Sequence, residues 1–342
     1  MSAMSIFNKN DSVLLVGEGN FSFSAALSRE LKQNLNVELI ATCYESGVNS
    51  QEAAERNVAY LRGNGIRVLF DVDATKLEEC PSLESRLFDK IIFNFPHAGG
   101  KMRIERNRDL LRGFFVSSER TLKRNGLALV TLCNGQGGTP VDVPGRRWDD
   151  SWKIVEMAAH GNFVLTRVEP FLWRSLRDYV VTGYRGLDKR FHTAGSLTHF
   201  FARSEPPGPH NVAPGDKIGT SEYTAVDNVT WRDVRKSIQD KLDRGAECIY
   251  PCGFTFDLTL STDRDFDTAE FYRSLHNYAG SVIESVDLID CYRSPVDEKL
   301  RRTYRIDYKS NCLPLYRRRV IELHQNVIAN FVEDKFKVTV SR

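Results

Sequence analysis

The stretch VLLVGEGNFS, residues 13–22, decides the fold of the N-terminal part of this chain. Its four consecutive apolar residues predict a short strand buried on both faces, and a turn with two glycines follows at once. Residues 21–33 then carry apolar side chains at helical spacing. A glycine turn into a helix presents unpaired backbone N–H groups, so Gly17, Glu18 and Gly19 are candidate cofactor-binding residues.

The alternation of strand and helix continues to residue 204. We expect strands at 13–16, 37–43, 66–70, 91–93, 127–132 and 163–168, and helices at 21–33, 50–62, 105–123 and 149–159. This order predicts an α/β, Rossmann-like domain with a parallel sheet and helices on both faces. Ligands of such sheets bind at the carboxyl ends of the strands.

Length and composition limit the remaining possibilities. The chain has 342 residues, 41% hydrophobic and 27% charged, which indicates two globular domains. A formal charge of +2 argues against nucleic-acid binding by bulk charge, so such binding would need local patches. We expect no membrane span, no secretory signal and no metal site, and the oligomeric state stays open. Seven widely spaced cysteines without a C-x-x-C motif favour a reducing compartment.

A second pattern begins after a proline-rich segment. We assign residues 1–204 to the first domain, 205–244 to a linker with a bridging helix at 231–244, and 245–342 to the second domain. In the last part we expect strands at 254–260, 282–289, 303–308 and 336–340, and helices at 268–279 and 315–331. The resulting order, βαββαβ, is the ferredoxin-like α+β arrangement.

Two acidic side chains follow successive strands of the first domain. Glu45 follows the second strand, where nucleotide-binding folds hold ribose hydroxyls, although it could equally be a solvated loop charge. Asp73 follows the third strand and could accept a hydrogen bond from an adenine amino group or could cap its own turn. Both would reach the same crevice as the glycine loop.

The fourth strand ends in NFPHAGG, residues 94–100. Asn94 leaves an apolar strand just before a proline-fixed turn, as in methyltransferases that alkylate nitrogen, where acceptors orient the attacking lone pair. His97 could take a proton from a weakly acidic ring nitrogen, or could be satisfied by loop backbone. Asn94 and His97 are therefore the candidate catalytic residues.

The motifs LLVGEGNFSFSAAL, DATKL and FDKIIFNFPHAGG resemble those of the Rossmann-like eukaryotic rRNA uridine-N3 methyltransferases. The resemblance covers residues 11–204. It implies a class I methyltransferase sheet that binds S-adenosylmethionine, with Gly17 and Gly19 in the cofactor loop, Asp73 near the adenosine and Asn94 near the methyl group. It also implies an rRNA substrate and a cytoplasmic or nucleolar location.

The last hundred residues resemble the ferredoxin-fold anticodon-binding domain that ends phenylalanyl-tRNA synthetase chains, which implies tRNA or other RNA as a partner. Residues 299–319 hold eight basic residues and one acidic residue, with Tyr304, Tyr308 and Tyr316 interleaved. Such a segment is typical of a phosphate-binding face with stacking aromatics, or of a solvated face that balances acids elsewhere. The candidate RNA-binding residues are Arg301, Arg302, Arg305, Arg317, Arg318 and Arg319.

Together these features favour an RNA methyltransferase that uses S-adenosylmethionine on a base nitrogen, by resemblance uridine N3. Two alternatives remain open. The chain could be a non-catalytic tRNA-binding adaptor with a degenerate methyltransferase fold. A nicotinamide oxidoreductase is disfavoured, because Ser22 stands where the dinucleotide motif has its third glycine.

Overall fold

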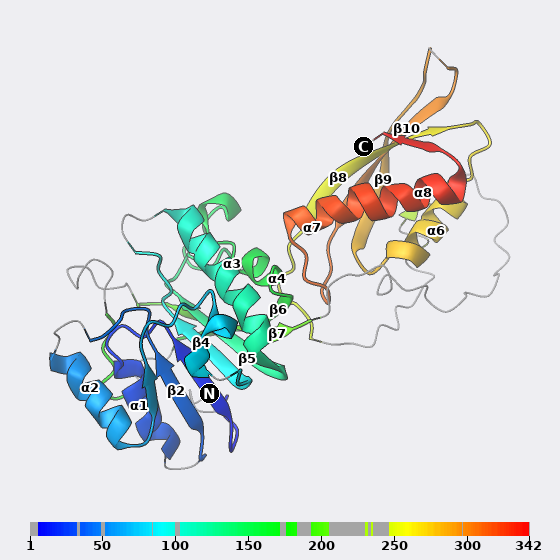
Figure 1. The fold of residues 1–342 in the computed structure, drawn as a ribbon. Helices are drawn as coiled ribbons and strands as arrows, with labels where there is room; N and C mark the ends of the chain where they lie inside the picture. Colours follow the sequence, from blue (N-terminus) through cyan, green and yellow to red (C-terminus); the bar gives the residue numbers. More distant parts are fainter. Residues whose placement is uncertain are drawn as a thin grey trace. The chain divides into compact units, whose positions relative to one another are not determined.

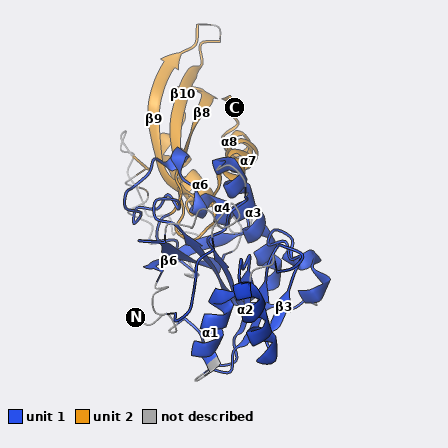
Figure 2. Cartoon of the chain, turned by 90° about the vertical axis from the view of Figure 1, so that its left-hand side faces the viewer, with its two compact units in different colours: residues 1–204, 246–250 blue, residues 205–245, 251–342 orange. Residues whose placement is uncertain are grey.

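The protein is described here by a computed structural model. It describes residues 6–32, 35–48, 52–83, 85–99, 103–171, 176–182, 193–204, 230, 231, 234, 246–295 and 297–341. The chain divides into two compact units (Figure 2). The first contains residues 1–204 and 246–250, and the second contains residues 205–245 and 251–342.

The first unit is built on a seven-stranded sheet in the order β3-β2-β1-β4-β5-β7-β6 (Figure 1). Its strands are β1 Ser12–Val16, β2 Glu38–Thr42, β3 Arg67–Leu69, β4 Phe88–Asn94, β5 Leu122–Leu132, β6 Phe163–Pro170 and β7 Leu197–Arg203. Its helices are α1 Ser22–Lys32, α2 Glu52–Gly63, α3 Ile104–Thr121 and α4 Ile154–Ala159, with short 3-10 turns at Leu77–Glu79, Pro81–Leu83 and Trp148–Asp150. The class I methyltransferase fold predicted from the sequence is confirmed.

The β1 strand is buried on both faces, as its continuous apolar run predicts. Val13 and Leu15 pack with Leu27 of α1. Side chains of the opposite face, such as Phe93 of β4, meet α3, where the Phe93 and Phe114 ring centroids lie 5.3 Å apart. Helices therefore cover both faces of the sheet.

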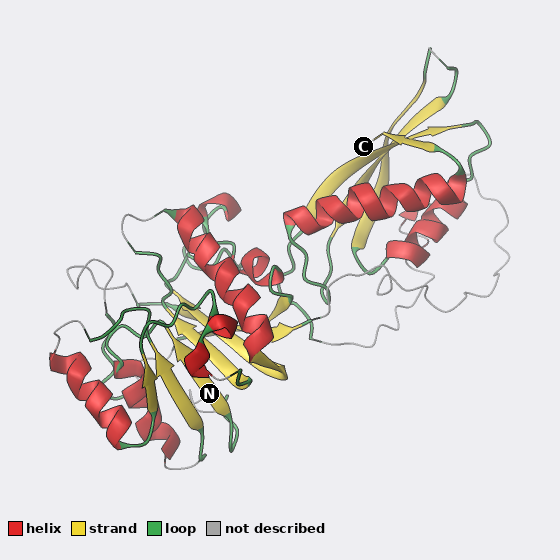
Figure 3. Ribbon diagram, viewed as in Figure 1, coloured by secondary structure: helices red, strands yellow, loops and turns green. Residues whose placement is uncertain are grey.

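The prediction of a parallel sheet was wrong at one edge, because β7 was not expected. It pairs antiparallel with both β5 and β6. Figure 3 draws the strands of this sheet in yellow, between the helices in red. Its sequence, LTHFFAR, has a histidine in the middle, so it does not show the continuous apolar run expected of a buried strand. His199 is fully buried, its Nδ1 lies 3.3 Å from the Val130 carbonyl oxygen, and burial lowers the pKa of the ring to about 4.

The second unit is a four-stranded antiparallel sheet in the order β11-β8-β10-β9. Its elements are β8 Phe254–Thr262, α6 Thr268–Ala279, β9 Ile283–Arg293, β10 Leu300–Tyr308, α7 Arg317–Glu322, a π-helical turn Leu323–Ile328, α8 Ala329–Phe336 and β11 Thr339–Ser341. The ferredoxin-like arrangement is thus confirmed. The expected last strand at 336–340 begins only at Thr339, because Phe336 ends the helix and packs against Phe266 and Phe271.

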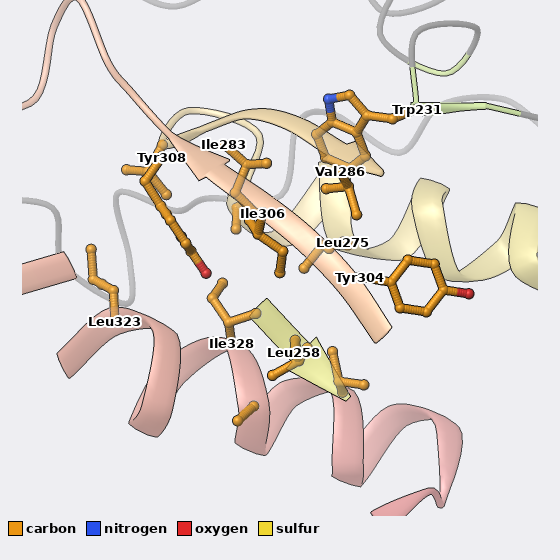
Figure 4. Packing of buried hydrophobic residues seen from close by; sticks show 14 of the residues in the cluster. Trp231, Leu258, Leu275, Ile283, Val286, Tyr304, Ile306, Tyr308, Leu323 and Ile328 are labelled. Carbon is orange, nitrogen blue, oxygen red and sulfur yellow. The ribbon is translucent and has the colours of Figure 1, made fainter. Parts of the chain in front are cut away.

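One apolar cluster holds this second sheet to its helices (Figure 4). Tyr304 and Tyr308 of β10 are fully buried in it, and the Tyr308 hydroxyl lies 2.8 Å from Nδ1 of His324. Trp231 joins the same cluster and donates from Nε1 to the Glu284 carbonyl oxygen at 3.1 Å. Most of the expected linker and bridging helix at 205–244 lies outside the described residues.

Replacing Phe115 by alanine tests the packing of α3 on the first sheet. Phe115 is fully buried against Phe163 and Phe201, with ring centroids 5.5 and 4.7 Å away. We expect Phe115→Ala to lower the free energy of unfolding by about 3–5 kcal/mol, measured by urea denaturation. Val116→Ala, at the adjacent exposed position, is the control and should change it by less than about 0.5 kcal/mol. Equal effects of both changes would contradict this account of the core.

Candidate active site

A cavity of about 1090 Å³ lies at the carboxyl ends of the strands in the first unit. Its volume is slightly above the range of about 300–1,000 Å³ typical of ligand pockets. All seven site residues proposed for the first domain line it: Gly17, Glu18, Gly19, Glu45, Asp73, Asn94 and His97. The structure therefore brings together side chains from four separate loops, as the parallel topology predicts.

Each glycine of the loop after β1 allows a close approach by another element. Gly17 has φ +66°, and a Cβ there would lie 2.3 Å from Cε2 of Phe93. A Cβ on Gly19 would lie 2.2 Å from Oγ1 of Thr182. Glycine is thus required at both positions by packing, and the backbone of the loop lines the cavity without side chains of its own at these points.

Glu18 joins the loop to the first turn of α1. Its Oε2 accepts hydrogen bonds from the Ser24 hydroxyl at 2.6 Å and the Ser24 backbone N–H at 3.2 Å. Its backbone N–H donates to the Thr42 carbonyl oxygen at 2.9 Å. Burial raises the pKa of the Glu18 carboxyl to about 7, and the two bonds from Ser24 oppose that rise. Glu18 thus ties the glycine loop to α1 and to β2, and it also lines the cavity.

The two other acidic residues differ in how firmly they are held. Asp73 caps its own turn, because its Oδ1 accepts from the Thr75 backbone N–H at 2.8 Å and from the Thr75 hydroxyl at 2.7 Å. Both bonds use Oδ1, which leaves Oδ2 as an acceptor for a ligand. The side chain of Glu45 is exposed at the cavity wall, and its carbonyl oxygen accepts from the Asp71 N–H at 3.0 Å.

The side chain of Asn94 is held through its amide oxygen, Oδ1. The Thr131 hydroxyl of β5 donates to Asn94 Oδ1 at 2.7 Å, and the Phe95 N–H donates to the Thr131 carbonyl oxygen at 2.9 Å. The sequence interpretation treated Asn94 as an acceptor for the substrate nitrogen. In the structure Oδ1 accepts from Thr131, which fixes the orientation of the amide, so the two Nδ2 hydrogens can donate to a ligand while Oδ1 keeps one lone pair.

The His97 loop is tied to backbone and to α3. His97 Nδ1 accepts from the Gly99 N–H at 2.9 Å, and the Ala98 N–H donates to Oδ1 of the buried Asn107 at 3.0 Å. A neutral imidazole that accepts at Nδ1 carries its proton on Nε2. As arranged, His97 is therefore a donor, and proton acceptance would require it to release Gly99.

Three features of the site were missed by the sequence interpretation. Thr131 stands out as a polar residue near the end of an apolar strand, which was an unused signal. Asn107 carried no signal of its role. The segment 176–182 also carried none, although Val180 exchanges bonds of 2.8 and 3.1 Å with the Ser22 hydroxyl and Tyr179 packs on Phe23.

The donors and acceptors of the cavity fit a nucleoside-bearing cofactor. Glycine-loop backbone, the exposed Glu45 carboxylate and Oδ2 of Asp73 can meet hydroxyl and amino groups, and Asn94 and His97 line the same cavity.

Residues 14–183 match the family "rRNA (uridine-N3-)-methyltransferase BTM5-like". The predicted resemblance is therefore confirmed. The match and the fold imply S-adenosylmethionine as the methyl-donor cofactor, rather than a nicotinamide dinucleotide.

Individual relatives include a human protein and a yeast methyltransferase. The chain is 47% identical over 196 residues to human ferredoxin-fold anticodon-binding domain-containing protein 1, an alignment that covers 57% of this chain and 31% of that protein. It is 26% identical over 224 residues to the Saccharomyces cerevisiae 25S rRNA (uridine(2634)-N(3))-methyltransferase, with 51% and 66% covered. The chain thus spans about a third of the length of the human relative.

Similar solved structures include TrmN from Thermus thermophilus, which is 12% identical with a TM-score of 0.37 over 58% of this chain and 46% of that one. A TehB-like SAM-dependent methyltransferase from Corynebacterium glutamicum is 16% identical, with a TM-score of 0.35 over 58% and 84%. Within the described part of this chain, no helix has the length and apolar character needed to cross a bilayer.

The expected stacking role of two tyrosines in the second unit was wrong. Tyr304 and Tyr308 are core residues, because alternate side chains of β10 face the helices. The same alternation separates Arg302 from Arg301 and Arg305, so the arginines of β10 do not share one face.

Local acidic groups hold several of these arginines. Arg305 binds both carboxylate oxygens of Asp257 at 2.9 and 3.1 Å, Arg301 pairs with Asp297 at 2.7 Å, and Arg318 pairs with Glu322 at 3.0 Å. Arg319 donates to the Pro314 carbonyl oxygen at 2.7 Å. Arg317 and Arg318 are both exposed in the first turn of α7, where Arg318 keeps its ion pair with Glu322.

The pKa of Glu18 predicts a specific pH dependence of stability. The folded pKa of about 7 exceeds the ordinary value of 4.5, so the contribution of Glu18 is fully present below pH 4.5 and is lost as pH rises through about 7. Glu18→Gln removes this titration. As pH rises from 4.5 to 7, the wild type should lose stability and the variant should not. The free energy of unfolding of the variant minus that of the wild type should therefore increase by up to about 3 kcal/mol.

The measurement is urea unfolding of both proteins at pH 4.5, 6 and 8. Glu55→Gln, on the exposed side of α2, controls for the loss of a carboxylate. A difference between Glu18→Gln and the wild type that does not vary with pH would refute the assigned burial effect.

Proposed function

We propose that this protein is an S-adenosylmethionine-dependent RNA methyltransferase that modifies a base nitrogen, most specifically N3 of uridine in rRNA. The observation that carries the proposal is a single cavity in which the glycine loop and Asn94 face the same space, within the region that matches the family. The name of the yeast relative supplies the choice of uridine N3.

The proposed chemistry is mainly one of positioning. Bound S-adenosylmethionine would supply an electrophilic methyl group and leave as S-adenosylhomocysteine. The proton that uridine N3 gives up would go to Nδ1 of His97, once that atom has released the Gly99 N–H. Gly17, Gly19 and Asp73 would hold its nucleoside portion, and the Nδ2 hydrogens of Asn94 would bind a carbonyl oxygen of the base and so aim the ring nitrogen. Holding two reactants in the correct orientation accounts for a large share of the rate in such reactions.

Charge on α3 supports an RNA substrate at this cavity. Arg106 and Arg112 both line it, and Arg112 also pairs with Asp109 at 2.8 Å. Guanidinium groups at the rim would attract the phosphates on either side of a target nucleotide. An enzyme that acts on rRNA or tRNA would work in the cytoplasm or the nucleolus.

The second unit is proposed to hold the RNA, either rRNA or tRNA, through Arg317 and Arg318 together with the arginines of β10. Three arginines occupy the first turn of α7, where no acidic residue stands. Cations are unfavourable near a helix N-terminus, which is consistent with selection for an anionic partner. The alternative function, a non-catalytic tRNA-binding adaptor, rests on the same arginines and differs in having no methyl transfer.

Methyl transfer from radiolabelled S-adenosylmethionine to total cellular RNA tests the proposal with the full chain. We expect incorporation by the wild type and a loss of about 10²–10³-fold in Asn94→Ala, since a donor aimed at the substrate is removed. Calorimetry should give the same affinity of both proteins for S-adenosylmethionine. Cofactor binding without transfer by the wild type would favour the adaptor, and no binding would overturn both the cofactor assignment and the enzyme.

Charge reversal at α7 tests the RNA-binding face. Arg317→Glu combined with Arg318→Glu should weaken RNA binding and reduce the dependence of log K on log salt by about one for each phosphate that is no longer neutralised. The matched control reverses Arg56 and Arg62 on α2, which lie outside the cavity lining. If both double variants bind RNA alike, the RNA face lies elsewhere.

A further inference from the structure

Three polar side chains stand side by side across the central strands of the first sheet. Asn94 of β4 is paired in register with Thr131 of β5, and Thr131 is paired in register with Thr198 of β7. The Thr131 hydroxyl donates to Asn94 Oδ1 at 2.7 Å and lies 3.0 Å from the Thr198 hydroxyl. The backbone register thus builds a line of hydrogen bonds that ends at the cavity.

The number of hydroxyl protons decides which residue is the donor in each of these hydrogen bonds. A hydroxyl has one proton to donate, and Thr131 uses it on Asn94. The Thr198 hydroxyl must therefore be the donor in its bond to Thr131. Thr131 is fully buried, so losing either bond would leave a polar group unsatisfied in a poorly solvated place.

The surroundings of the three residues are mostly apolar, with Glu169 as the one charged side chain among the described residues that line the small cavity beside them. Asn94, Thr131 and Thr198 line a second, smaller cavity of about 80 Å³ together with Leu129 and Phe200. Asn94 belongs to the walls of both this cavity and the large one. In such surroundings a hydrogen bond is stronger than in water, so the orientation of the amide is firmly held.

We infer that Thr131, supported by Thr198, is a positioning residue that fixes the polarity of the Asn94 amide and thereby selects a pyrimidine with a carbonyl oxygen, rather than an amino group, at C4 beside the reacting N3. With Oδ1 held on Thr131, the Nδ2 hydrogens lie on the other side of the amide and can donate to a base. Uracil offers O4 as an acceptor, whereas cytosine offers an amino donor at the same position. The inference rests on the proposed function and adds the residue that decides between the two pyrimidines.

The test compares Thr131→Val and Thr131→Ser in the full chain. Valine keeps the branched shape and removes the hydroxyl, and serine restores it. Thr166→Val is the matched control, because Thr166 lies on β6 of the same sheet and donates to the Phe200 carbonyl oxygen at 3.1 Å. Urea unfolding and calorimetry with S-adenosylmethionine establish that each variant folds and binds the cofactor.

We expect Thr131→Val to lower kcat about 10- to 100-fold on a uridine-containing RNA, since a misplaced substrate group costs that much. The preference for uridine over the matched cytidine RNA should fall as well, while KM for the cofactor is unchanged. Thr131→Ser should recover both rate and preference, and Thr166→Val should match the wild type. A Thr131→Val enzyme with wild-type rate and preference would overturn the inference.

A second readout does not depend on turnover. With ¹⁵N-asparagine labelling, the side-chain amide signals of Asn94, assigned by their loss in Asn94→Ser, should shift or broaden in Thr131→Val and return in Thr131→Ser. Unchanged signals in Thr131→Val would refute the hydrogen-bonded line itself. If the wild type transfers no methyl group to any RNA but these signals change as expected, the proposed function fails while the positioning of Asn94 stands.

Discussion

The passage from β1 into α1 depends on Gly17 having no side chain where the ring of Phe93 lies. The residue has φ +66°, and a Cβ would come within 2.3 Å of that ring. An L-residue with a side chain would meet both the backbone strain and the clash. The position of α1, the Glu18–Ser24 bonds and the wall of the large cavity all follow from this one turn.

Strand register decides which polar side chains lie next to each other in the first sheet. Asn94 was recognisable from its place at a strand end, but the partner that orients it comes from β5, 37 residues later in the chain. Pairing of β5 with β4 and β7 brings Thr131 and Thr198 to the same level. An amide that could present either of its two ends to a ligand thereby presents one.

In the second unit, the pleat of β10 places neighbouring residues of the basic segment on opposite faces of the sheet. Along the sequence, the arginines and tyrosines of β10 form one cluster. In the folded sheet, Tyr304 and Tyr308 enter the core, and Arg305 turns to the opposite face and binds Asp257. Exposed ion pairs of this kind contribute little to stability, so their acidic partners mainly reduce the charge available to RNA. The first turn of α7 adds three arginines and no acidic residue.

The sequence by itself determined the order of elements and most of the cavity lining. A continuous apolar run, glycine turns and period-3.6 helices specify a βαβ sheet, and the carboxyl ends of parallel strands must meet at one edge, so Gly17, Glu45, Asp73 and Asn94 were brought together as expected.

Only the tertiary structure decided the antiparallel β7 strand, the segment 176–182 over the glycine loop and the polarity of Asn94. Each depends on a partner distant in the chain: β5 and β6 for β7, Ser22 for Val180, and Thr131 for Asn94. Local patterns record which side chains prefer burial. They do not record which remote atom uses up a donor or an acceptor, and that choice sets what the site can bind.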